Sequence, residues 1–340
     1  MQASCSFWRR VRVSAIAGAL FLGISFVPVA IPAQPVTAAS KIRIGALQSG
    51  TLNWLLDVIR THSFDRSGDI ELEIVPFAST QETKAALLSH SIDLIVTDWL
   101  WVSRERSMGT DLTFAPFSTD IGALMVPPDS SVKSLDDLKG KSLGVAGGPL
   151  DKSWLIIVAY TMRVAYFDLR TATSPVFASP QILADKVQNH SIDAVLEYWP
   201  YAARLEAKGF SQVISMEDLP LELGAKGKVA MVGYVFSENW ANSNPSAIEG
   251  FLEAASKANQ LLASSDEEWQ RLRPMMAADD NATFEALKKY YRQGIPGRSI
   301  HENEADAKVL YQFLRQLGGE ELVGSGTDLA PGTFWTRGVE

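Results

Sequence analysis

The sequence predicts an α/β protein with two lobes, each built on a doubly wound, mostly parallel sheet. The chain of 340 residues is longer than one hydrophobic core usually organises, and it suits two units of about 100–150 residues. One segment recurs after an interval of 100 residues, and short apolar runs alternate with helical segments in both halves. The hydrophobic fraction of 46% and the charged fraction of 21% are typical of a globular chain.

The repeat relates residues 75–109 to residues 175–209. Without gaps, 11 of the 35 positions are identical, whereas unrelated sequences of ordinary composition would share about two. The phrases Phe-Ala-Ser-x-Gln and His-Ser-Ile-Asp occur in both copies. A coincidence between two βαβ units is the alternative. It predicts the same architecture, because both segments show the same order of elements.

Both halves are expected to alternate strands with helices. In the first half, strands are expected at 42–47, 70–76 and 92–97, and helices at 51–61 and 79–89. In the second half, strands are expected at 142–146, 175–178 and 192–196, and helices near 151–166, 180–189 and 200–208. Continuous apolar strands that alternate with helices predict parallel sheets with right-handed crossovers.

Two further apolar runs are expected to carry the chain between the lobes. Residues 121–126, which precede two prolines, have the pattern of a strand leaving the first lobe, and residues 229–236 have that of a returning strand. The helical segments after residue 244 are expected to pack on the first lobe, and residues 318–340 to form an irregular tail. The predicted boundaries are 40–125 and 232–340 for lobe I, and 126–231 for lobe II.

The N-terminus has the features of a secretory signal peptide. Three arginines lie among residues 9–12, an apolar stretch interrupted by a proline covers residues 13–31, and small residues follow at 37–39. This order predicts a signal peptide of residues 1–39 that is cleaved near Ala39. An uncleaved membrane anchor is the alternative, which the prolines and the small residues disfavour. The choice between the Sec and Tat routes stays open.

The cysteine content and the net charge exclude several kinds of chemistry and of binding partner. Cys5 is the only cysteine and lies within the predicted signal peptide, so the mature chain has no disulfide and no thiol nucleophile. Because Cys5 precedes the apolar stretch, it is not placed to carry a lipid at the cleavage point. Without residues 1–39, 28 basic residues face 39 acidic ones, a net charge of −11. That charge argues against nucleic acid or an anionic membrane as partner. We expect a soluble periplasmic monomer.

The expected ligand site lies in the loops that follow the strands. In open parallel sheets, ligands bind beyond the carboxyl ends of the strands. Helix starts after Gly50 and Gly148 would present backbone N–H groups to a polar or anionic group. The expected ligand-binding residues are Gln48, Ser49, Thr51, Asn53, Asp98 and Trp99 in the first lobe, and Gly148, Ser153, Glu197, Tyr198 and Trp199 in the second.

Two acids occupy nearly equivalent positions at the ends of the third strands. Asp98 precedes Trp99, and Glu197 precedes Tyr198 and Trp199. A carboxylate among aromatic rings suits a cation or a polarised nitrogen heterocycle. The alternatives are that the tryptophans pack between helix and sheet, and that Asp98 caps a helix. Glu197 has no evident structural need, so a ligand role is favoured there.

The sequence contains no motif for catalysis, a cofactor or a metal. It has no Walker, GxGxxG or GxSxG pattern and no spacing typical of zinc or calcium ligands. His90 and His190 form a matched pair, but both fall at helix–strand turns away from the expected cleft. We therefore predict no enzyme, no catalytic residue, no cofactor and no metal ligand.

Several phrases are similar to those of one transport family. They are Lys-Ile-Arg-Ile-Gly at 41–45, Ser-Ile-Asp-Leu-Ile-Val at 91–96, Ser-Leu-Asp-Asp-Leu-Lys-Gly-Lys-Ser-Leu-Gly-Val at 134–145, Ser-Ile-Asp-Ala-Val-Leu-Glu-Tyr-Trp-Pro at 191–200 and the helix start at 244–252. Across about residues 41–265, the chain resembles the periplasmic solute-binding proteins of the nitrate/sulfonate/taurine ABC-transporter group, which includes relatives that bind thiamine precursors.

This resemblance implies the two-lobed type II periplasmic-binding-protein fold with a two-strand hinge, and import of a small molecule through an inner-membrane ABC permease. It also implies that the loops after Leu47, Val96, Ala146 and Leu196 line the cleft. Asp98 and Glu197 are more acidic than a sulfonate or nitrate binder would want, so a small polar, cationic or heterocyclic ligand is expected. The alternatives are a periplasmic accessory protein of a quinoprotein or metal-uptake system, and a non-transport enzyme on the same fold.

Overall fold

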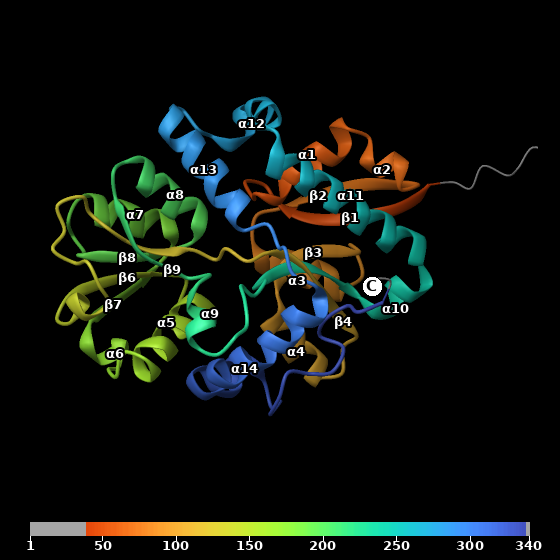
Figure 1. Ribbon diagram of the computed structural model, residues 1–340. Helices are drawn as coiled ribbons and strands as arrows, with labels where there is room; N and C mark the ends of the chain where they lie inside the picture. Colours follow the sequence, from red (N-terminus) through yellow and green to blue (C-terminus); the bar gives the residue numbers. More distant parts are fainter. Residues whose placement is uncertain (1–38, 338–340) are drawn as a thin grey trace, which may run out of the picture. The chain divides into compact units, whose positions relative to one another are not determined.

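The computed structural model describes residues 39–337 and contains two five-stranded sheets (Figure 1). The predicted signal peptide lies outside these residues, except for Ala39. The first sheet has the order β2-β1-β3-β10-β4, and the second has the order β7-β6-β8-β5-β9. The strands of the first sheet are β1 (Ser40–Leu47), β2 (Ile70–Phe77), β3 (Leu94–Asp98), β4 (Leu112–Ser118) and β10 (Val232–Ser237). Those of the second are β5 (Ala123–Val126), β6 (Ser142–Ala146), β7 (Ser174–Ala178), β8 (Ala194–Glu197) and β9 (Ser211–Ser215).

Helices follow most of the strands. Those of the first lobe are α1 (Leu52–Thr61), α2 (Phe64–Ser67), α3 (Thr80–Leu88) and α4 (Trp99–Ser107). Those of the second are η1 (Asp136–Leu138), α5 (Lys152–Arg163), α6 (Leu169–Ala172), α7 (Pro180–Gln188), α8 (Trp199–Ala207) and α9 (Leu219–Glu222). The C-terminal part adds α10 (Glu238–Ser243), α11 (Pro245–Ser264), α12 (Asp266–Leu272), η2 (Arg273–Met276), α13 (Asn281–Gln293) and α14 (Ile300–Val323).

Each sheet is parallel except for one strand. In the first sheet, β10 runs antiparallel between β3 and β4. In the second, β5 runs antiparallel between β8 and β9. Each antiparallel strand is the one that enters from the other lobe, so the two sheets have the same topology. The prediction of two doubly wound, mostly parallel sheets is therefore confirmed.

The repeat in the sequence is also a repeat in packing. A Cβ atom on Gly45 of β1 would lie 2.4 Å from the Ile92 side chain, and one on Gly144 of β6 would lie 2.6 Å from that of Ile192. In both sheets, the isoleucine of the His-Ser-Ile-Asp phrase thus packs directly over a glycine in the first strand. This matched contact explains why both positions lack a side chain.

The change from one sheet to the other occurs between strands. The chain leaves the first sheet after β4 and enters the second at β5, through residues 119–122; it returns through residues 216–231. Residues 123–126 pair with β8 and β9. The boundary that the sequence suggests at 125/126 therefore falls inside a strand of the second sheet. The sequence pattern also missed β4 and β9, the edge strands beside the two antiparallel strands.

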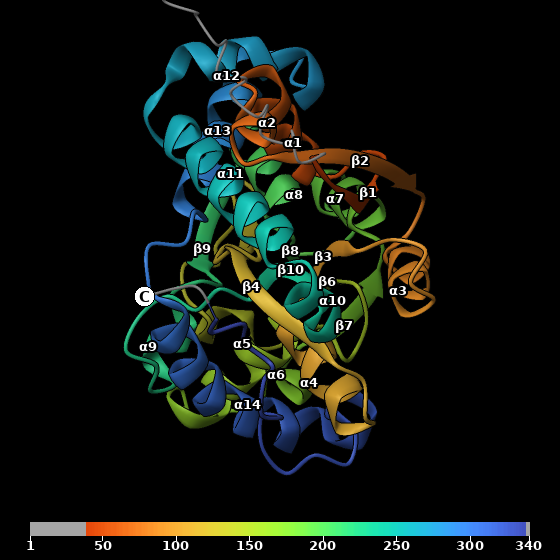
Figure 2. The same cartoon turned by 90° about the vertical axis from the view of Figure 1, so that its right-hand side faces the viewer.

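The C-terminal helices contact both lobes, which corrects the expectation that they pack on the first alone. Helix α11 packs against α1 and α2, whereas α13 packs against α8 and α14 contacts both α4 and α5 (Figures 1 and 2). Polar contacts reinforce the packing of α13 on α8. Lys289 of α13 pairs with Glu206 of α8 at 2.8 Å, and the Tyr290 hydroxyl donates to the same carboxylate at 3.0 Å. The amphipathic face of α13 is buried by this contact with the second lobe.

The end of the described chain is tied to the edge of the first sheet. Helix α14 continues to Val323 with a kink at Gly319, so the predicted irregular tail begins later than expected. Phe114 N–H of β4 donates to Thr333 O at 2.8 Å, and Trp335 N–H donates to Phe114 O at 2.8 Å. This short segment covers an edge strand that would otherwise present unpaired backbone groups.

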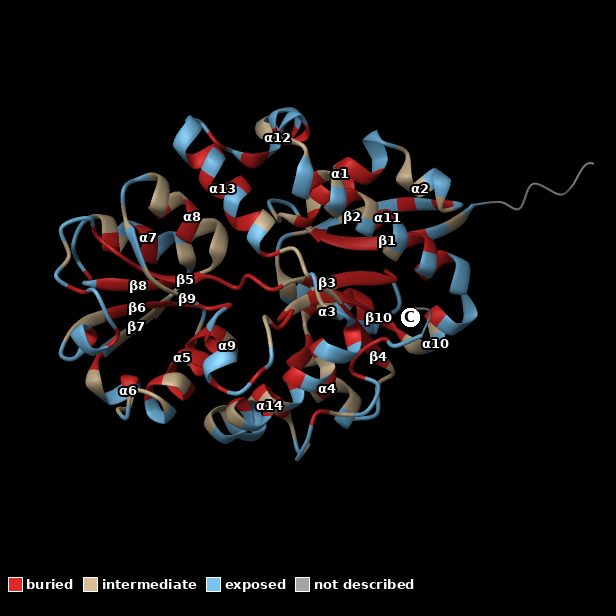
Figure 3. Ribbon diagram, in the orientation of Figure 1, coloured by how far each residue is buried: buried red, intermediate tan, exposed pale blue. Residues whose placement is uncertain are grey.

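Burial follows the layers of the fold. Most residues of β3, β4, β5, β6 and β8 are buried, and the helices around the sheets are exposed on their outer faces (Figure 3). Between residues 39 and 337, no helix has both the length and the apolar character needed to cross a membrane.

Candidate functional site

A cavity of about 300 Å³ lies where the strand ends of the two sheets meet. Its wall from the first lobe comes from the β1–α1 loop, α3, β3 and the end of β4. Its wall from the second lobe comes from the start of α5 and the β8–α8 loop. The polar residues that line the cavity, from both lobes together, are Thr51, Thr80, Thr83, Ser118, Asp120, Lys152 and Tyr198. The remainder is apolar and includes Val96, Phe117 and Trp199.

Three of the residues expected from sequence line this cavity. Thr51 lies just before α1, and Tyr198 and Trp199 begin α8. Gln48 and Asn53 line a different hollow, together with Asp57 and Arg60. The Asn53 amide donates to Leu47 O at 2.8 Å, so it orders the loop after β1.

Ser49, Gly148 and Ser153 are not among the residues that line the cavity. Ser49 is exposed and Gly148 is partly exposed, while Ser153 is buried in the first turn of α5. The Ser153 backbone N–H donates to the Asp151 carboxylate at 2.9 Å, as expected at a helix start.

For Asp98 and Trp99, the structure shows the packing and capping roles. Trp99 is fully buried, and its ring centroid lies 6.4 Å from that of Phe334 in the C-terminal segment. Asp98 Oδ1 accepts a hydrogen bond from Trp101 N–H at 2.9 Å and caps α4. Burial acts to raise the pKa of Asp98, but the ammonium groups of Lys152 and Lys84 outweigh it and hold this pKa below its usual range.

Glu197 is buried but does not line the cavity. Its side chain is 1% exposed, and neither carboxyl oxygen has a hydrogen-bond partner among the described residues. Burial raises the pKa of Glu197 to about 8, because the charged form would lose its hydration. At neutral pH the carboxyl is therefore mainly neutral. Asp98 and Glu197 therefore do not line this cavity as a pair of charged carboxylates.

Lys152 supplies the positive charge in the wall. It is the first residue of α5, directly after Asp151, which caps this helix. The Tyr198 hydroxyl donates to Asp151 Oδ2 at 2.9 Å, so the start of α5 and the β8–α8 loop are held together. Gly147 has φ +86°, and a Cβ there would lie 2.7 Å from the Tyr198 hydroxyl. The glycine before this helix is thus required by both backbone conformation and space.

Asp120 carries the only carboxyl group in the part of the cavity lining that residues 39–337 provide. It is 4% exposed, and its Oδ1 accepts from Gly122 N–H at 2.9 Å. Burial first and the nearby Glu217 second raise the pKa of Asp120 to about 8. Among the described residues that line the cavity, Lys152 therefore carries the one formal charge expected at neutral pH.

Aromatic rings close one side of the cavity. Trp199 packs edge to face on Trp54 of α1, with centroids 6.0 Å apart, and on Tyr291 of α13 at 6.2 Å. Trp54 in turn packs on Trp269 of α12 at 6.0 Å. The cluster joins helices from distant parts of the sequence, which sequence periodicity alone does not bring together.

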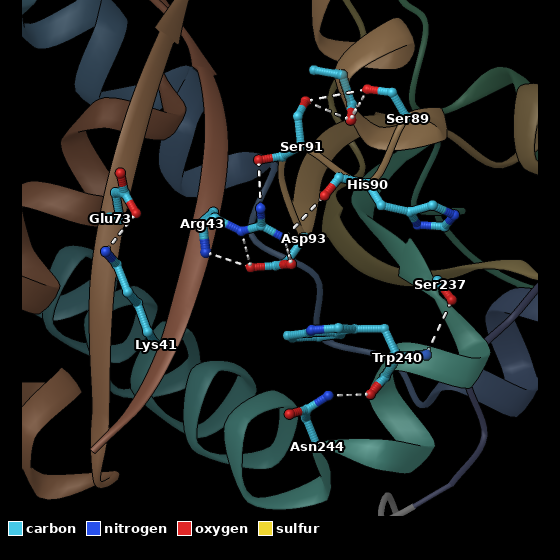
Figure 4. A network of polar contacts seen from close by, with 11 residues as sticks. Lys41, Arg43, Glu73, Ser89, His90, Ser91, Asp93, Ser237, Trp240 and Asn244 are labelled. Atoms are coloured by element: carbon cyan, nitrogen blue, oxygen red, sulfur yellow. Dashed lines mark hydrogen bonds and ion pairs between the residues drawn. The ribbon is translucent and has the colours of Figure 1, made fainter. Parts of the chain in front are cut away.

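The predicted surface role of the two histidines agrees with the structure. His90 and His190 both have φ +57° in exposed turns before β3 and β8. The Arg43 guanidinium donates to the His90 carbonyl at 3.1 Å and to Asp93 Oδ1 at 2.6 Å (Figure 4). Within residues 39–337, no group of three or more metal-binding side chains is suitably placed for a metal ion.

The expected ligand-binding residues include neither Lys152 nor Asp120, for different reasons. Lys152 follows the glycine-rich turn after β6, a strand end that was identified, so its position was a usable signal. Asp120 follows β4, a strand that the apolar pattern did not reveal. No local motif marks this carboxyl group as part of a site.

Comparisons with known proteins agree with the fold. The family model described as NMT1/THI5 like matches residues 62–268, more than half of the chain. Among solved structures, the periplasmic aliphatic sulphonate binding protein SsuA from Escherichia coli has a TM-score of 0.69 at 20% identity, covering 87% of this chain and 97% of that chain. No curated protein sequence matches the chain.

Two further structures bear on the choice between binding and catalysis. The alkanesulfonate-binding protein SsuA from Xanthomonas axonopodis pv. citri, bound to MOPS, has a TM-score of 0.61 at 18% identity and covers 87% of this chain and 98% of that chain. The desulfurization enzyme DSZB has a TM-score of 0.55 at 16% identity, covering 82% and 92%. At these identities the likeness concerns the fold.

Proposed function

Because this chain belongs to the NMT1/THI5 like family, we propose that it is the solute-binding component of an ABC importer. It acts in the periplasm as a monomer, captures a small molecule between its lobes and delivers it to a membrane permease. Support comes from the two-lobed fold, which it shares with periplasmic sulphonate-binding proteins, and from a cavity lined by both lobes.

The proposed ligand is a small organic anion with an apolar body. The observation that carries this proposal is Lys152, the one charged side chain expected in the wall at neutral pH. An ammonium group in a largely apolar cavity attracts an anion more strongly than it would in water. This differs from the cation or heterocycle expected from sequence, because Glu197 is neutral and Asp98 caps a helix.

The size and lining of the cavity support the same ligand class. A volume of about 300 Å³ is at the lower end for ligand pockets, so a metabolite-sized molecule fits and a peptide does not. Val96, Phe117 and Trp199 offer apolar surface for an alkyl or aromatic body. The hydroxyl groups of Thr51 and Thr80 can donate hydrogen bonds to the head group, whereas the Thr83 hydroxyl already donates to Thr80 O at 2.9 Å.

The test compares probes that differ in charge but share a body. We expect 1-butanesulfonate to bind in calorimetric titration and to raise the melting temperature, whereas butyltrimethylammonium does neither. At 100 times its Kd, the sulfonate would add about 2.7 kcal/mol to the free energy of unfolding. A neutral aminopyrimidine probe tests the heterocycle alternative. Binding of the ammonium or aminopyrimidine probe without the sulfonate would overturn the anion assignment.

The matched variants are Lys152→Gln and Lys133→Gln. Removing the ammonium group from the wall should weaken butanesulfonate at least tenfold, because a charge-assisted contact is worth about 1.5–3 kcal/mol. Lys133 is an exposed residue of the same lobe, outside the cavity, so its variant should bind like the wild type. Equal affinities of the two variants would contradict the proposal.

The likeness to DSZB keeps an enzyme as the alternative. A binding protein should return its ligand unchanged. We expect butanesulfonate recovered from the protein after prolonged incubation to have its original mass. A new product in the mass spectrum, formed by the wild type but not by heat-denatured protein, would favour the enzyme.

A further inference from the structure

The segment that carries the chain from β4 to β5 holds Asp120 rigidly in the cavity wall. Asp120 Oδ1 accepts from Gly122 N–H at 2.9 Å. Gly122 has φ +135°, and a Cβ there would lie 1.9 Å from Glu197 O. The backbone of this segment is therefore pressed against the end of β8. Since Oδ1 is engaged by the backbone, the second carboxyl oxygen is the one available to a ligand.

The returning segment contacts the same place. Met216 N–H donates to Gly122 O at 2.9 Å, and Glu217 Oε2 accepts from the Thr119 hydroxyl at 3.2 Å. The Lys228 ammonium group pairs with Glu217 Oε1 at 2.5 Å. The ammonium group of Lys228 is thus bound to Glu217, and among residues 39–337 no basic side chain forms an ion pair with Asp120.

The surroundings of Asp120 keep its carboxyl group protonated at neutral pH. From the returning segment it faces Glu217, Asp218 and Lys228, and from α13 it faces Tyr290. Lys152 lies in the wall of the same cavity. Burial and the charge of Glu217 together raise the pKa of Asp120 to about 8, against the opposing effects of Gly122 N–H and Lys228.

We propose that Asp120 is a specificity-determining residue, which donates a hydrogen bond from its free carboxyl oxygen to the head group of the bound anion. The inference rests on the proposed anion-binding function. A carboxylic acid donor in the same cavity lining as Lys152 favours head groups whose oxygens only accept hydrogen bonds, as sulfonate oxygens do. Once ionised, the same group becomes an acceptor beside a second anion and repels it.

The experiment follows butanesulfonate binding by calorimetric titration from pH 6.5 to pH 9.5. The sulfonate stays ionised over this range, so any change reports on the protein. For the wild type, we expect the affinity to fall at least tenfold as the pH rises through about 8. Above that pH, binding should take up a proton, measured as a binding enthalpy that depends on the ionisation enthalpy of the buffer.

Two variants at Asp120 distinguish hydrogen-bond donation by its side chain from the space that the side chain fills. Asp120→Asn keeps an N–H donor and cannot ionise, so its affinity at pH 6.5 should stay within about threefold of the wild type and lose its pH dependence. Asp120→Ala should bind at least tenfold more weakly at pH 6.5. Circular dichroism melting of each variant establishes that it is folded before titration, and the near-isosteric asparagine keeps the test decisive if the alanine variant fails to fold.

Glu197→Gln is the matched control, because the carboxyl group of Glu197 titrates in the same range but does not line the cavity. It should bind with the wild-type pH dependence. If Asp120→Asn retains that dependence, or if Asp120→Ala binds like the wild type at pH 6.5, the inference about Asp120 is wrong while anion binding stands. If butanesulfonate binds to none of the proteins, the proposed function itself is overturned.

Discussion

Trp54 of α1 and Trp199 of α8 meet edge to face, with ring centroids 6.0 Å apart and an angle of 77° between the rings. One helix belongs to the first lobe and the other to the second. Tyr291 of α13 contacts both rings, at 5.9 Å and 6.2 Å. The contact thus lies beside the cavity and joins the two lobes through their aromatic side chains, which are the strongest apolar contributors to such interfaces.

Trp199 and its repeat equivalent Trp99 should separate binding from stability. Trp199→Phe shortens a side chain of the cavity wall, so we expect at least threefold weaker butanesulfonate binding with little change in melting temperature. Trp99→Phe alters a fully buried ring against Phe334, and should cost about 1–2 kcal/mol of unfolding free energy with unchanged affinity. Titration and denaturant unfolding of both variants provide the check. The reverse pattern would mean that the two roles have been exchanged.

Glu197 should make stability fall with rising pH. The pKa of Glu197 is about 8 in the folded chain and has its ordinary value of 4.5 in the unfolded chain. At a pH between these two values, the folded chain keeps a proton that the unfolded chain has lost. The unfolded state then binds fewer protons, so the free energy of unfolding decreases as pH rises. Glu197→Gln removes this contribution, so its free energy of unfolding relative to the wild type should rise by about 2.7 kcal/mol between pH 6 and pH 9.

The measurement is denaturant unfolding of both proteins at each pH. Asp120 has a raised pKa as well and acts in the same direction, but it is present in both proteins and cancels in the difference. A difference that is constant over this pH range would show that Glu197 does not titrate there.

The Arg43–Asp93 pair should contribute more to the free energy of unfolding than the exposed Lys41–Glu73 pair. Asp93 is 8% exposed and accepts from Arg43 N–H, Nε and Nη2 at 2.8, 3.0 and 2.6 Å (Figure 4). Asp93→Ala should therefore cost about 2–3 kcal/mol of unfolding free energy. Glu73 of β2 forms an exposed pair with Lys41 of β1, and Glu73→Gln should cost less than about 1 kcal/mol. Equal losses in urea unfolding would contradict this ranking.

Gly122 should tolerate no side chain. Gly122→Ala combines a positive φ with a Cβ 1.9 Å from a backbone oxygen of β8, so we expect a loss above about 3 kcal/mol or failure to fold. Gly109 also has a positive φ, but a Cβ there meets nothing within 4 Å, so Gly109→Ala should cost only about 1–2 kcal/mol. Thermal unfolding of both variants tests the difference. A small loss of stability in Gly122→Ala would show that the backbone of residues 119–122 can move to make room for the methyl group.

Much of the fold was predictable because its signals are local. Strand β1 alternates polar and apolar residues, and β3, β6 and β8 are short, mostly apolar runs. Ser79 caps α3 by accepting from Glu82 N–H at 3.3 Å, as its spacing predicts. The reciprocal bond goes from Ala78 N–H to the Glu82 carboxylate at 3.0 Å, one residue earlier than in the usual capping box. Strand β4 contains Pro116 and β9 is only half-buried, so neither shows a clear alternation.

The site was less predictable, because equivalent positions in the repeat have different surroundings. Trp99 is covered by Phe334 of the C-terminal segment, whereas Trp199 meets α1 and α13 beside the cavity. Asp98 caps a helix, whereas the buried carboxyl group of Glu197 has no hydrogen-bond partner in the described part of the chain, so two acids that look alike in sequence differ in charge. Neither difference depends on residues close in the sequence.

By itself, the sequence determined two mostly parallel sheets and the strand ends at which the cavity lies. Those features follow from the apolar pattern and the repeat, which act within a few dozen residues. Only the tertiary structure decided which strand-end residues face the cavity and which charge it carries. The reason is physical: Lys152 and Asp120 line the same cavity only because the chain crosses between the lobes, and burial by distant parts of the fold sets the ionisation of Asp120 and Glu197.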